Sequence, residues 1–158
     1  MNKKLYPSIS KLWYNFILSN TKYKNTPIPE FYYFCDNEKD ANDCAQLVVD
    51  GVKRATSTSL WWFETYKQPL PKIGDLTIVT DWKGTAKAVI ETIKIEKTPF
   101  NKITSEYAEI EGEGDKSLAY WNKVHWEYYT REMNEQGEKP TKDMLLICEH
   151  FKTVYLKK

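Results

Sequence analysis

The chain has 158 residues, a length that suits one domain with its own apolar core. Its 23 Lys and Arg nearly balance its 22 Asp and Glu, and the net charge of +1 excludes a strong overall attraction to nucleic acid. Aromatic residues make up 15% of the chain. Most are expected in the core, but such an excess also suits a cleft that stacks on planar ligands.

Three cysteines, Cys35, Cys44 and Cys148, show no Cys-x-x-Cys spacing. This pattern argues against a disulfide framework and a zinc site and fits a reducing compartment. The basic segment 1–7 is not followed by the apolar run of a signal peptide, and no apolar run is long enough to span a membrane. We therefore predict a cytoplasmic, soluble single domain over residues 1–158, with no metal or cofactor.

The first half of the chain predicts two helices and two strands. The expected elements are a helix at 10–19, a strand at 31–35, a helix capped by Asp36, an aromatic-rich segment at 60–66, and a strand at 76–80 with a turn at 81–84. Gly51 stands where the second helix needs a left-handed residue at its end.

The second half predicts a long return strand at 85–95, whose alternation slips between Ile90 and Ile93 and indicates a bulge or bend. The elements expected after it are a helix capped by Thr104 through Ile110, a long helix capped by Asp115 to about Gln136, and a closing strand at 144–154. Helices and strands alternate without a βαβ rhythm, which favours an α+β fold with a mainly antiparallel sheet.

The segment 51–59 joins two adjacent cations, Lys53 and Arg54, to four consecutive hydroxyl side chains. In a structural interpretation, Lys53 pairs with the negative end of the preceding helix and the hydroxyl residues begin a strand. In a chemical interpretation, Lys53 is the base or charge stabiliser that activates the Thr56 hydroxyl, because threonine is a weak nucleophile until a neighbour takes its proton.

Other residues are candidates for contacts with phosphate. Arg54 would point away from Lys53 in a strand, with Ser57 and Thr58 as secondary donors. Ser117 lies near the start of the long helix, where free N–H groups bind anions.

The run Glu111-Gly112-Glu113-Gly114-Asp115 places three carboxylates between glycines. It reads either as a solvated turn that caps the next helix or as a flexible segment that brings Glu111 into a cleft as a general acid or base. The long helix then carries Trp121 and His125 on an aromatic stripe, which is more typical of core than of a ligand site. Phosphate-binding glycine loops and the G-x-S-x-G and H-E-x-x-H motifs are absent from the sequence.

Four segments, 51–57, 71–75, 81–84 and 111–125, together resemble the ASCH domain family, a branch of the PUA-like fold. The last segment is similar to the longer bacterial subgroup. The resemblance implies a small bent β-barrel flanked by helices, with a ligand cleft between them. It also implies RNA binding, and ribonuclease activity in some members.

A shorter bacterial branch resembles an amidohydrolase that deacetylates acetylated cytidine. Its catalytic Lys, Thr and Glu fall by motif on Lys53, Thr56 and Glu111, with Glu113 as the alternative carboxylate. The resemblance thus supports a hydrolase of modified nucleosides, with Thr56 as nucleophile, as one hypothesis.

The hypothesis we favour from sequence is an RNA- or nucleotide-binding domain in which Lys53, Arg54 and Ser117 meet phosphate. The ligand-binding residues expected under it are Arg54, Ser57, Thr58, Trp61, Ser117, Trp121 and His125, with Trp61 or Trp121 stacking a base. A protein-interaction module is the third possibility, and the sequence does not predict an oligomeric state.

Overall fold

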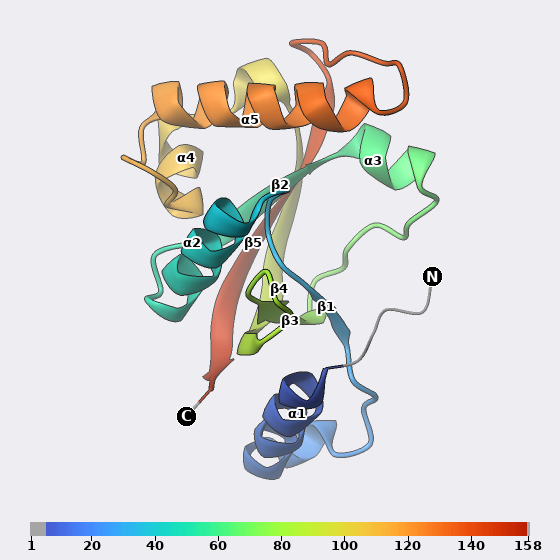
Figure 1. The fold of residues 1–158 in the computed structure, drawn as a ribbon, viewed down its shortest axis with the longest axis vertical. Coiled ribbons are helices and arrows are strands. Elements are labelled where there is room, and N and C mark those ends of the chain that lie inside the picture. Colours follow the sequence, from blue (N-terminus) through green and yellow to red (C-terminus); the bar gives the residue numbers. More distant parts are fainter. Residues whose placement is uncertain (1–5, 158) are drawn as a thin grey trace. The chain divides into compact units, whose positions relative to one another are not determined.

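The computed structural model describes residues 6–157, so most of the basic N-terminal segment, predicted not to be a signal peptide, lies outside the described residues. Figure 1 shows the arrangement of the helices and strands. The helices are α1 (Pro7–Ser19), α2 (Glu38–Val49), α3 (Leu60–Thr65), α4 (Ser105–Glu111) and α5 (Leu118–Asn134). The strands are β1 (Glu30–Tyr32), β2 (Ala55–Ser59), β3 (Leu76–Thr80), β4 (Ala86–Pro99) and β5 (Leu145–Leu156).

The five strands are hydrogen-bonded in the order β1-β3-β4-β5-β2. β1 is parallel to β3, whereas β3 with β4 and β2 with β5 are antiparallel. The predicted α+β class with a mainly antiparallel sheet is therefore confirmed. None of the helices in residues 6–157 is both long and apolar enough to cross a bilayer.

The register irregularity in the β3–β4 pairing differs from the predicted position. It lies between Val79 and Thr80, which pair with Ala88 and Ala86. Near Ile90, the consecutive residues Ala88, Val89 and Ile90 are all buried, so both faces of β4 are covered there. The bulge or bend predicted at 90–93 stays a prediction.

The chain divides into two compact units, and β4 and β5 run through both. Unit 1 comprises the described residues 6–51, 75–91 and 152–157, and unit 2 comprises residues 52–74 and 92–151. In unit 1, the predicted apolar stripe of α1, including Leu12, Trp13 and Phe16, packs against Ile78 and Val89. The assignment of residues 1–158 to a single domain stays a prediction.

The core of unit 2 is strongly aromatic. It contains Phe100, Tyr107, Trp121, Tyr129 and the β5 residue Leu146, and the rings of Phe100 and Trp121 lie 5.3 Å apart. Much of the aromatic excess noted in the composition is therefore core, as its helical spacing predicted.

Two helix caps differ from prediction by one or two residues. The cap of α2 is Asn37, whose side chain accepts a hydrogen bond from the Asp40 N–H, whereas Asp36 accepts from the Asn37 amide. The cap of α5 is Ser117 instead of Asp115. The caps predicted at Thr104 and the left-handed Gly51 (φ 71°) are confirmed.

The ends of two strands and one helix also differ from the predicted ends. β1 ends at Tyr32, and Cys35, predicted to lie in the same strand, instead adopts a left-handed conformation with φ of 65°. α5 ends at Asn134, two residues before the predicted end, and the left-handed Gly137 follows. β4 continues to Pro99, beyond the predicted end at 95.

Candidate functional site

The two faces of the segment that leads into β2 differ in burial. Lys53, Ala55, Ser57 and Ser59 are buried, whereas Arg54 is exposed and Thr56 and Thr58 are half-buried. Strand alternation explains the pattern within β2, because successive side chains point to opposite faces. The prediction that Lys53 and Arg54 face different environments is confirmed.

Lys53 is completely buried and pairs with two carboxylates. Its Nζ lies 3.3 Å from Oε1 of Glu111 and 2.6 Å from Oε1 of Glu113. The interpretation in which Lys53 pairs with the end of the preceding helix is therefore wrong. An ammonium group buried without such partners would be far too costly to retain its charge.

Glu111 is the centre of this group of side chains. Its Oε1 accepts hydrogen bonds from Lys53 and His125, and its Oε2 accepts from the Ser57 hydroxyl at 2.9 Å and from the indole N–H of Trp121. The side chain is 98% buried by solvent-accessible area, since only 2% remains exposed. Four donors match the four lone-pair sites of a carboxylate, so Glu111 has no remaining acceptor capacity.

His125 is held in its charged form by the geometry of its partners. Its Nδ1 lies 2.9 Å from the Trp121 carbonyl oxygen and its Nε2 lies 3.2 Å from Glu111 Oε1. Both partners only accept hydrogen bonds, so both ring nitrogens must donate and the ring is an imidazolium. The ring also stacks on Trp121, with centroids 4.1 Å apart, which places the cation over an aromatic face.

The pKa shifts agree with this assignment. Burial by itself disfavours charge on both groups, but it is outweighed by the charges of their partners. Attraction to His125 and Lys53, with hydrogen bonds from His125 and Trp121, lowers the pKa of Glu111 to about 2. Attraction and hydrogen bonding to Glu111 raise the pKa of His125 above its usual 6.5. We refer to Lys53, Glu111, Glu113 and His125 as the ionic cluster, whose two positive and two negative charges cancel.

Glycine at position 112 allows the two carboxylates to reach Lys53. Gly112 has φ of 74°, and a Cβ built there would lie 2.7 Å from the carbonyl oxygen of Val52. The Arg54 N–H donates to the Ile110 carbonyl at 3.0 Å, which ties the end of α4 to the same segment. A larger residue at 112 would push α4 away from Lys53, so the expected role of the glycines in bringing Glu111 inward is supported.

Two tyrosines hold the backbone of β2 beside the ionic cluster. The Tyr107 hydroxyl donates to the Thr56 carbonyl and the Tyr129 hydroxyl donates to the Ser57 carbonyl, each at 3.0 Å. Burial and the charge of Glu111 raise the pKa of both well above the usual 10.0, so they are neutral donors. Neither tyrosine was predicted as a site residue, because aromatic residues at helical spacing are more typical of core.

Thr56 does not join the predicted set. Ser57, not Thr56, supplies the hydroxyl that contacts Glu111, and Thr56 faces the other side of β2 opposite Glu149. The reason is the strand period of two: a residue that shares a face with Ser57 cannot be its neighbour. Thr58 shares the face of Thr56 and pairs with Ile147.

Trp121 and Ser117 are unsuited to the contacts predicted for them. Trp121 is only 2% exposed and its N–H is bonded to Glu111, so it has no free face for a base. Ser117 caps α5, and its backbone N–H donates to Asp115 Oδ1 at 2.8 Å. A phosphate at this helix end would meet the Asp115 carboxylate, which already occupies the position of an anion.

Glu111, Glu113 and His125 each bring one potential metal ligand within 4.8 Å of the others. The Lys53 ammonium lies against both carboxylates, where it takes the place of a cation. The donor set is thus already neutralised by an internal positive charge. A metal would have to displace Lys53 and bind a histidine that carries both of its protons.

The predicted residue Trp61 lies in α3, which has no buried residue. Its ring makes an edge contact with Tyr66 at 6.2 Å, and Trp62 contacts both Phe63 and Tyr66. Ser59 caps this helix through the Trp62 N–H. Of these aromatic residues, only Trp61 was predicted from the sequence to bind a ligand. The run of three consecutive aromatic residues at 61–63 could have indicated its neighbours as well.

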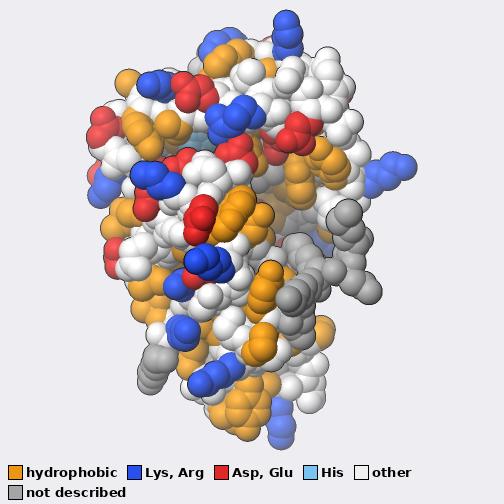
Figure 2. Space-filling model, in the orientation of Figure 1, with side chains coloured by type: hydrophobic (Ala, Val, Ile, Leu, Met, Phe, Trp, Pro, Cys, Tyr) orange, Lys and Arg blue, Asp and Glu red, His pale blue; other side chains and the backbone are white. Residues whose placement is uncertain are grey.

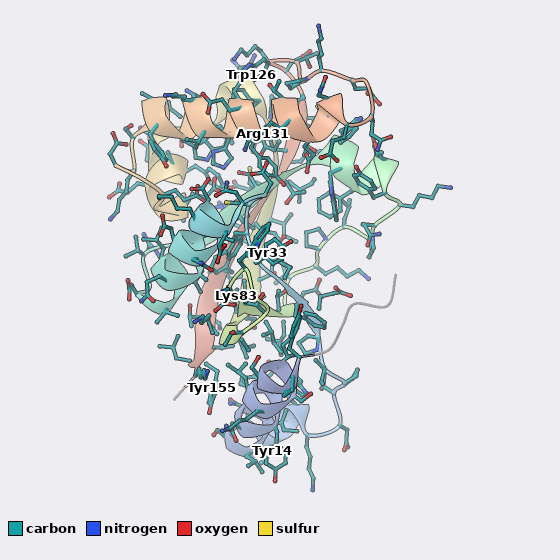
Figure 3. The ribbon with its side chains drawn as sticks, viewed as in Figure 1. Tyr14, Tyr33, Lys83, Trp126, Arg131 and Tyr155 are labelled. Atoms are coloured by element: carbon teal, nitrogen blue, oxygen red, sulfur yellow. The ribbon has the colours of Figure 1, made fainter. Side chains whose placement is uncertain are left out.

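A separate hollow of about 320 Å³ in unit 2 is lined by Phe100, Asn101, Ile103, Leu118, Asn122 and Lys142. None of the predicted site residues lines it. The Lys142 ammonium lies 3.5 Å above the ring of Trp126, a residue labelled on α5 in Figure 3. We therefore do not assign the main site to this hollow.

The fold and the ionic cluster define an α+β protein in which side chains from the segment before β2, from β2 and from α5 surround the carboxylate at the end of α4. The chain belongs to the ASCH domain family, whose model matches residues 30–155. This family has a PUA-like fold, which is often linked to RNA binding.

Solved structures support the same conclusion. An ASCH domain from Lactobacillus crispatus JV V101 is 33% identical, with a TM-score of 0.89 and 98% of each chain covered. A protein from Enterococcus faecalis V583 is 32% identical, with a TM-score of 0.85, covering 94% of this chain and 89% of that one. No protein with curated annotation matches significantly.

Proposed function

We propose that this protein binds single-stranded RNA or a nucleotide through an aromatic surface on unit 2. This aromatic surface consists of Trp61, Trp62, Phe63 and Tyr66. The observation that carries the proposal is that none of these four rings is buried, although they contact one another. Trp61, Trp62 and Phe63 are half-buried and Tyr66 is 37% exposed, so each side chain keeps solvent-accessible surface on which a nucleobase can stack.

The surroundings of the aromatic surface support a nucleic-acid ligand. Leu70 and Ile73, which follow in the chain, are 44% and 70% exposed, so the apolar character continues beyond the helix. Lys67 and Lys72 are exposed within the same stretch. Both lysines follow the aromatic residues in the chain. Cations that accompany aromatic residues are typical of surfaces that track a phosphate backbone while stacking its bases.

The ionic cluster is less suited to contact phosphate directly. Lys53 has no exposed surface, and its charge is already paired with Glu111 and Glu113. This also disfavours a ribonuclease mechanism in which Lys53 stabilises developing charge. Arg54, which is exposed beside it, is the better candidate for a phosphate contact. Acidic and basic side chains are interspersed over α5 in Figure 2, so charge alone does not define a site there.

The amidohydrolase hypothesis has weaker support. Glu111 already accepts four hydrogen bonds, and a carboxylate with a pKa of about 2 is a poor base at neutral pH. The hydroxyl in contact with it belongs to Ser57, so Ser57 replaces Thr56 as the nucleophile that such a mechanism would use.

The test is a titration of short single-stranded RNA, followed by fluorescence anisotropy at several salt concentrations. Trp61→Ala should weaken binding roughly tenfold, since one base stack contributes about 1–3 kcal/mol. Arg54→Ala should reduce the slope of log affinity against log salt by about one phosphate contact.

The matched controls are Tyr14→Ala and Lys11→Ala, which remove an exposed ring and an exposed cation from α1. Both should bind RNA as the unmodified protein does. Equal losses in Trp61→Ala and Tyr14→Ala, or no salt-dependent binding at all, would refute the proposal. Turnover of acetylated cytidine that is lost in Ser57→Ala would favour the hydrolase instead.

A further inference from the structure

Two of the three cysteines lie in contact within unit 1. The Sγ atoms of Cys35 and Cys44 are 3.7 Å apart, although nine positions separate the residues in the chain. Cys35 belongs to the turn after β1, and Cys44 lies on the buried face of α2. A disulfide has an S–S length of about 2 Å, so the two sulfurs are in contact but must move closer together to form the bond.

The two thiols differ in access to solvent. Cys35 is half-buried, whereas Cys44 is only 3% exposed. An accessible thiol backed by a protected partner is the arrangement in which one sulfur reacts first and the other resolves the product. The third cysteine, Cys148, is 1% exposed, and burial raises its pKa to about 12, so it is inert at neutral pH.

The turn that carries Cys35 is held on both sides. The ring of Tyr33, labelled in Figure 3, lies 4.7 Å from the ring of Trp82. The backbone N–H of Trp82 donates to the side-chain oxygen of Asn42 in α2. Two residues after Cys35, Asn37 caps the same helix. These contacts keep the turn against α2, which favours reaction between the two thiols over reaction with another molecule.

We propose that Cys35 and Cys44 are a modification site, at which a hydroperoxide converts the contacting thiols into an intramolecular disulfide. The Cys35 thiolate attacks one peroxide oxygen, the O–O bond breaks, and Cys35 becomes a sulfenic acid as the first water or alcohol leaves. The Cys44 sulfur then attacks the Cys35 sulfur, the S–O bond breaks, and water leaves with the proton of Cys44. Two thiols are oxidised by two electrons and the peroxide is reduced, so the step balances.

The test treats the full chain with hydrogen peroxide, blocks the remaining thiols with an alkylating agent, and maps the peptides by mass spectrometry. The expected product is one linked pair of peptides carrying Cys35 and Cys44, with Cys148 alkylated only after unfolding. The protein should lose about 2 Da, the mass of two hydrogens, and recover it with a thiol reductant.

Three variants separate the roles of the sulfurs. Cys148→Ser should form the disulfide as the unmodified protein does. Cys44→Ser should stop at a sulfenic acid on Cys35 that a dimedone probe captures, and Cys35→Ser should leave Cys44 unoxidised. Oxidation of Cys35 without a link to Cys44, a disulfide between two molecules, or oxidation of Cys148 as fast as Cys35 would each overturn the proposal.

Discussion

The segments before and after β2 both depart from the usual rule that charged side chains are exposed and aromatic side chains are buried. Before the strand, Lys53 enters the ionic cluster, where charged side chains are buried. After the strand, α3 carries three consecutive aromatic residues, and none of its residues is buried. One short segment of unit 2 therefore buries a charged side chain and leaves aromatic side chains partly exposed.

The difference shows that partners, and not residue type alone, decide which side chains are buried here. The ionic cluster is tolerated because each charged group has partners of opposite charge or hydrogen-bond donors and acceptors. The rings of α3 contact one another, and they are half-buried or exposed, with none of them fully buried. The first arrangement satisfies buried charges, and the second leaves apolar surface partly exposed.

Among tests of the contrast between the ionic cluster and the aromatic surface, we expect the largest effect when the charge of Glu111 is removed. Glu111→Gln leaves Lys53 and His125 buried without their shared counter-charge, so we expect a loss of about 3–5 kcal/mol in the free energy of unfolding. Urea denaturation at neutral pH measures it. Glu109→Gln, at an exposed position on the same helix, is the control and should change stability by less than about 0.5 kcal/mol. Equal losses in the two variants would mean that the ionic cluster does not stabilise the fold.

The second effect is a dependence of stability on pH. The folded pKa of His125 is raised above 6.5, so its contribution is complete below pH 6.5 and is lost as the pH rises through the folded pKa. The folded pKa of Glu111 is lowered from 4.5 to about 2, so its contribution is present above pH 4.5 and is lost as the pH falls toward 2.

Stability should therefore be greatest between pH 4.5 and 6.5 and fall by up to about 1.4 kcal/mol per pH unit on the alkaline side. Chemical denaturation of the unmodified protein and of His125→Gln across pH 4 to about 9 measures the contribution as a difference curve. A difference that does not change above pH 6.5 would contradict an imidazolium at His125.

The smallest effect concerns the aromatic surface. Trp61→Ala should lower the free energy of unfolding by no more than about 1 kcal/mol, because the ring is not buried. The matched variant is Trp121→Ala, which removes a 2%-exposed ring from the core and should cost about 3–5 kcal/mol. Thermal unfolding of both variants measures the contrast. A large loss in Trp61→Ala would assign α3 to the core and remove its availability for RNA.

Much of the local structure was predictable because it depends on neighbouring residues. The helix over 105–111 followed from its cap at Thr104, and the left-handed conformation of Gly51 followed from the end of α2. The predicted helix caps were wrong by one or two residues where two nearby polar side chains could each cap the helix. Asp36 and Asn37 are both candidates for the N-cap of α2, and Asp115 and Ser117 are both candidates for that of α5. The backbone conformation selects Asn37 and Ser117.

The site was predictable only in part. The resemblance to ASCH domains predicted that Lys53 and Glu111 belong to one site. In the structure, Nζ of Lys53 lies 3.3 Å from Oε1 of Glu111. The catalytic hydroxyl was assigned to Thr56 by motif, whereas the contact with Glu111 comes from Ser57. The hydroxyls are adjacent in sequence, and strand alternation puts them on opposite faces, so spacing alone does not choose between them.

The sequence by itself determined the family, the α+β class and the positions of most elements, because these depend on periodicity and on motifs within short segments. Only the tertiary structure decided that Lys53 is buried between two carboxylates, that His125 is charged, and that Cys35 contacts Cys44. These states depend on partners that are distant in sequence or on which face of an element a side chain takes. Packing supplies that information, because it sets which groups meet where water is excluded.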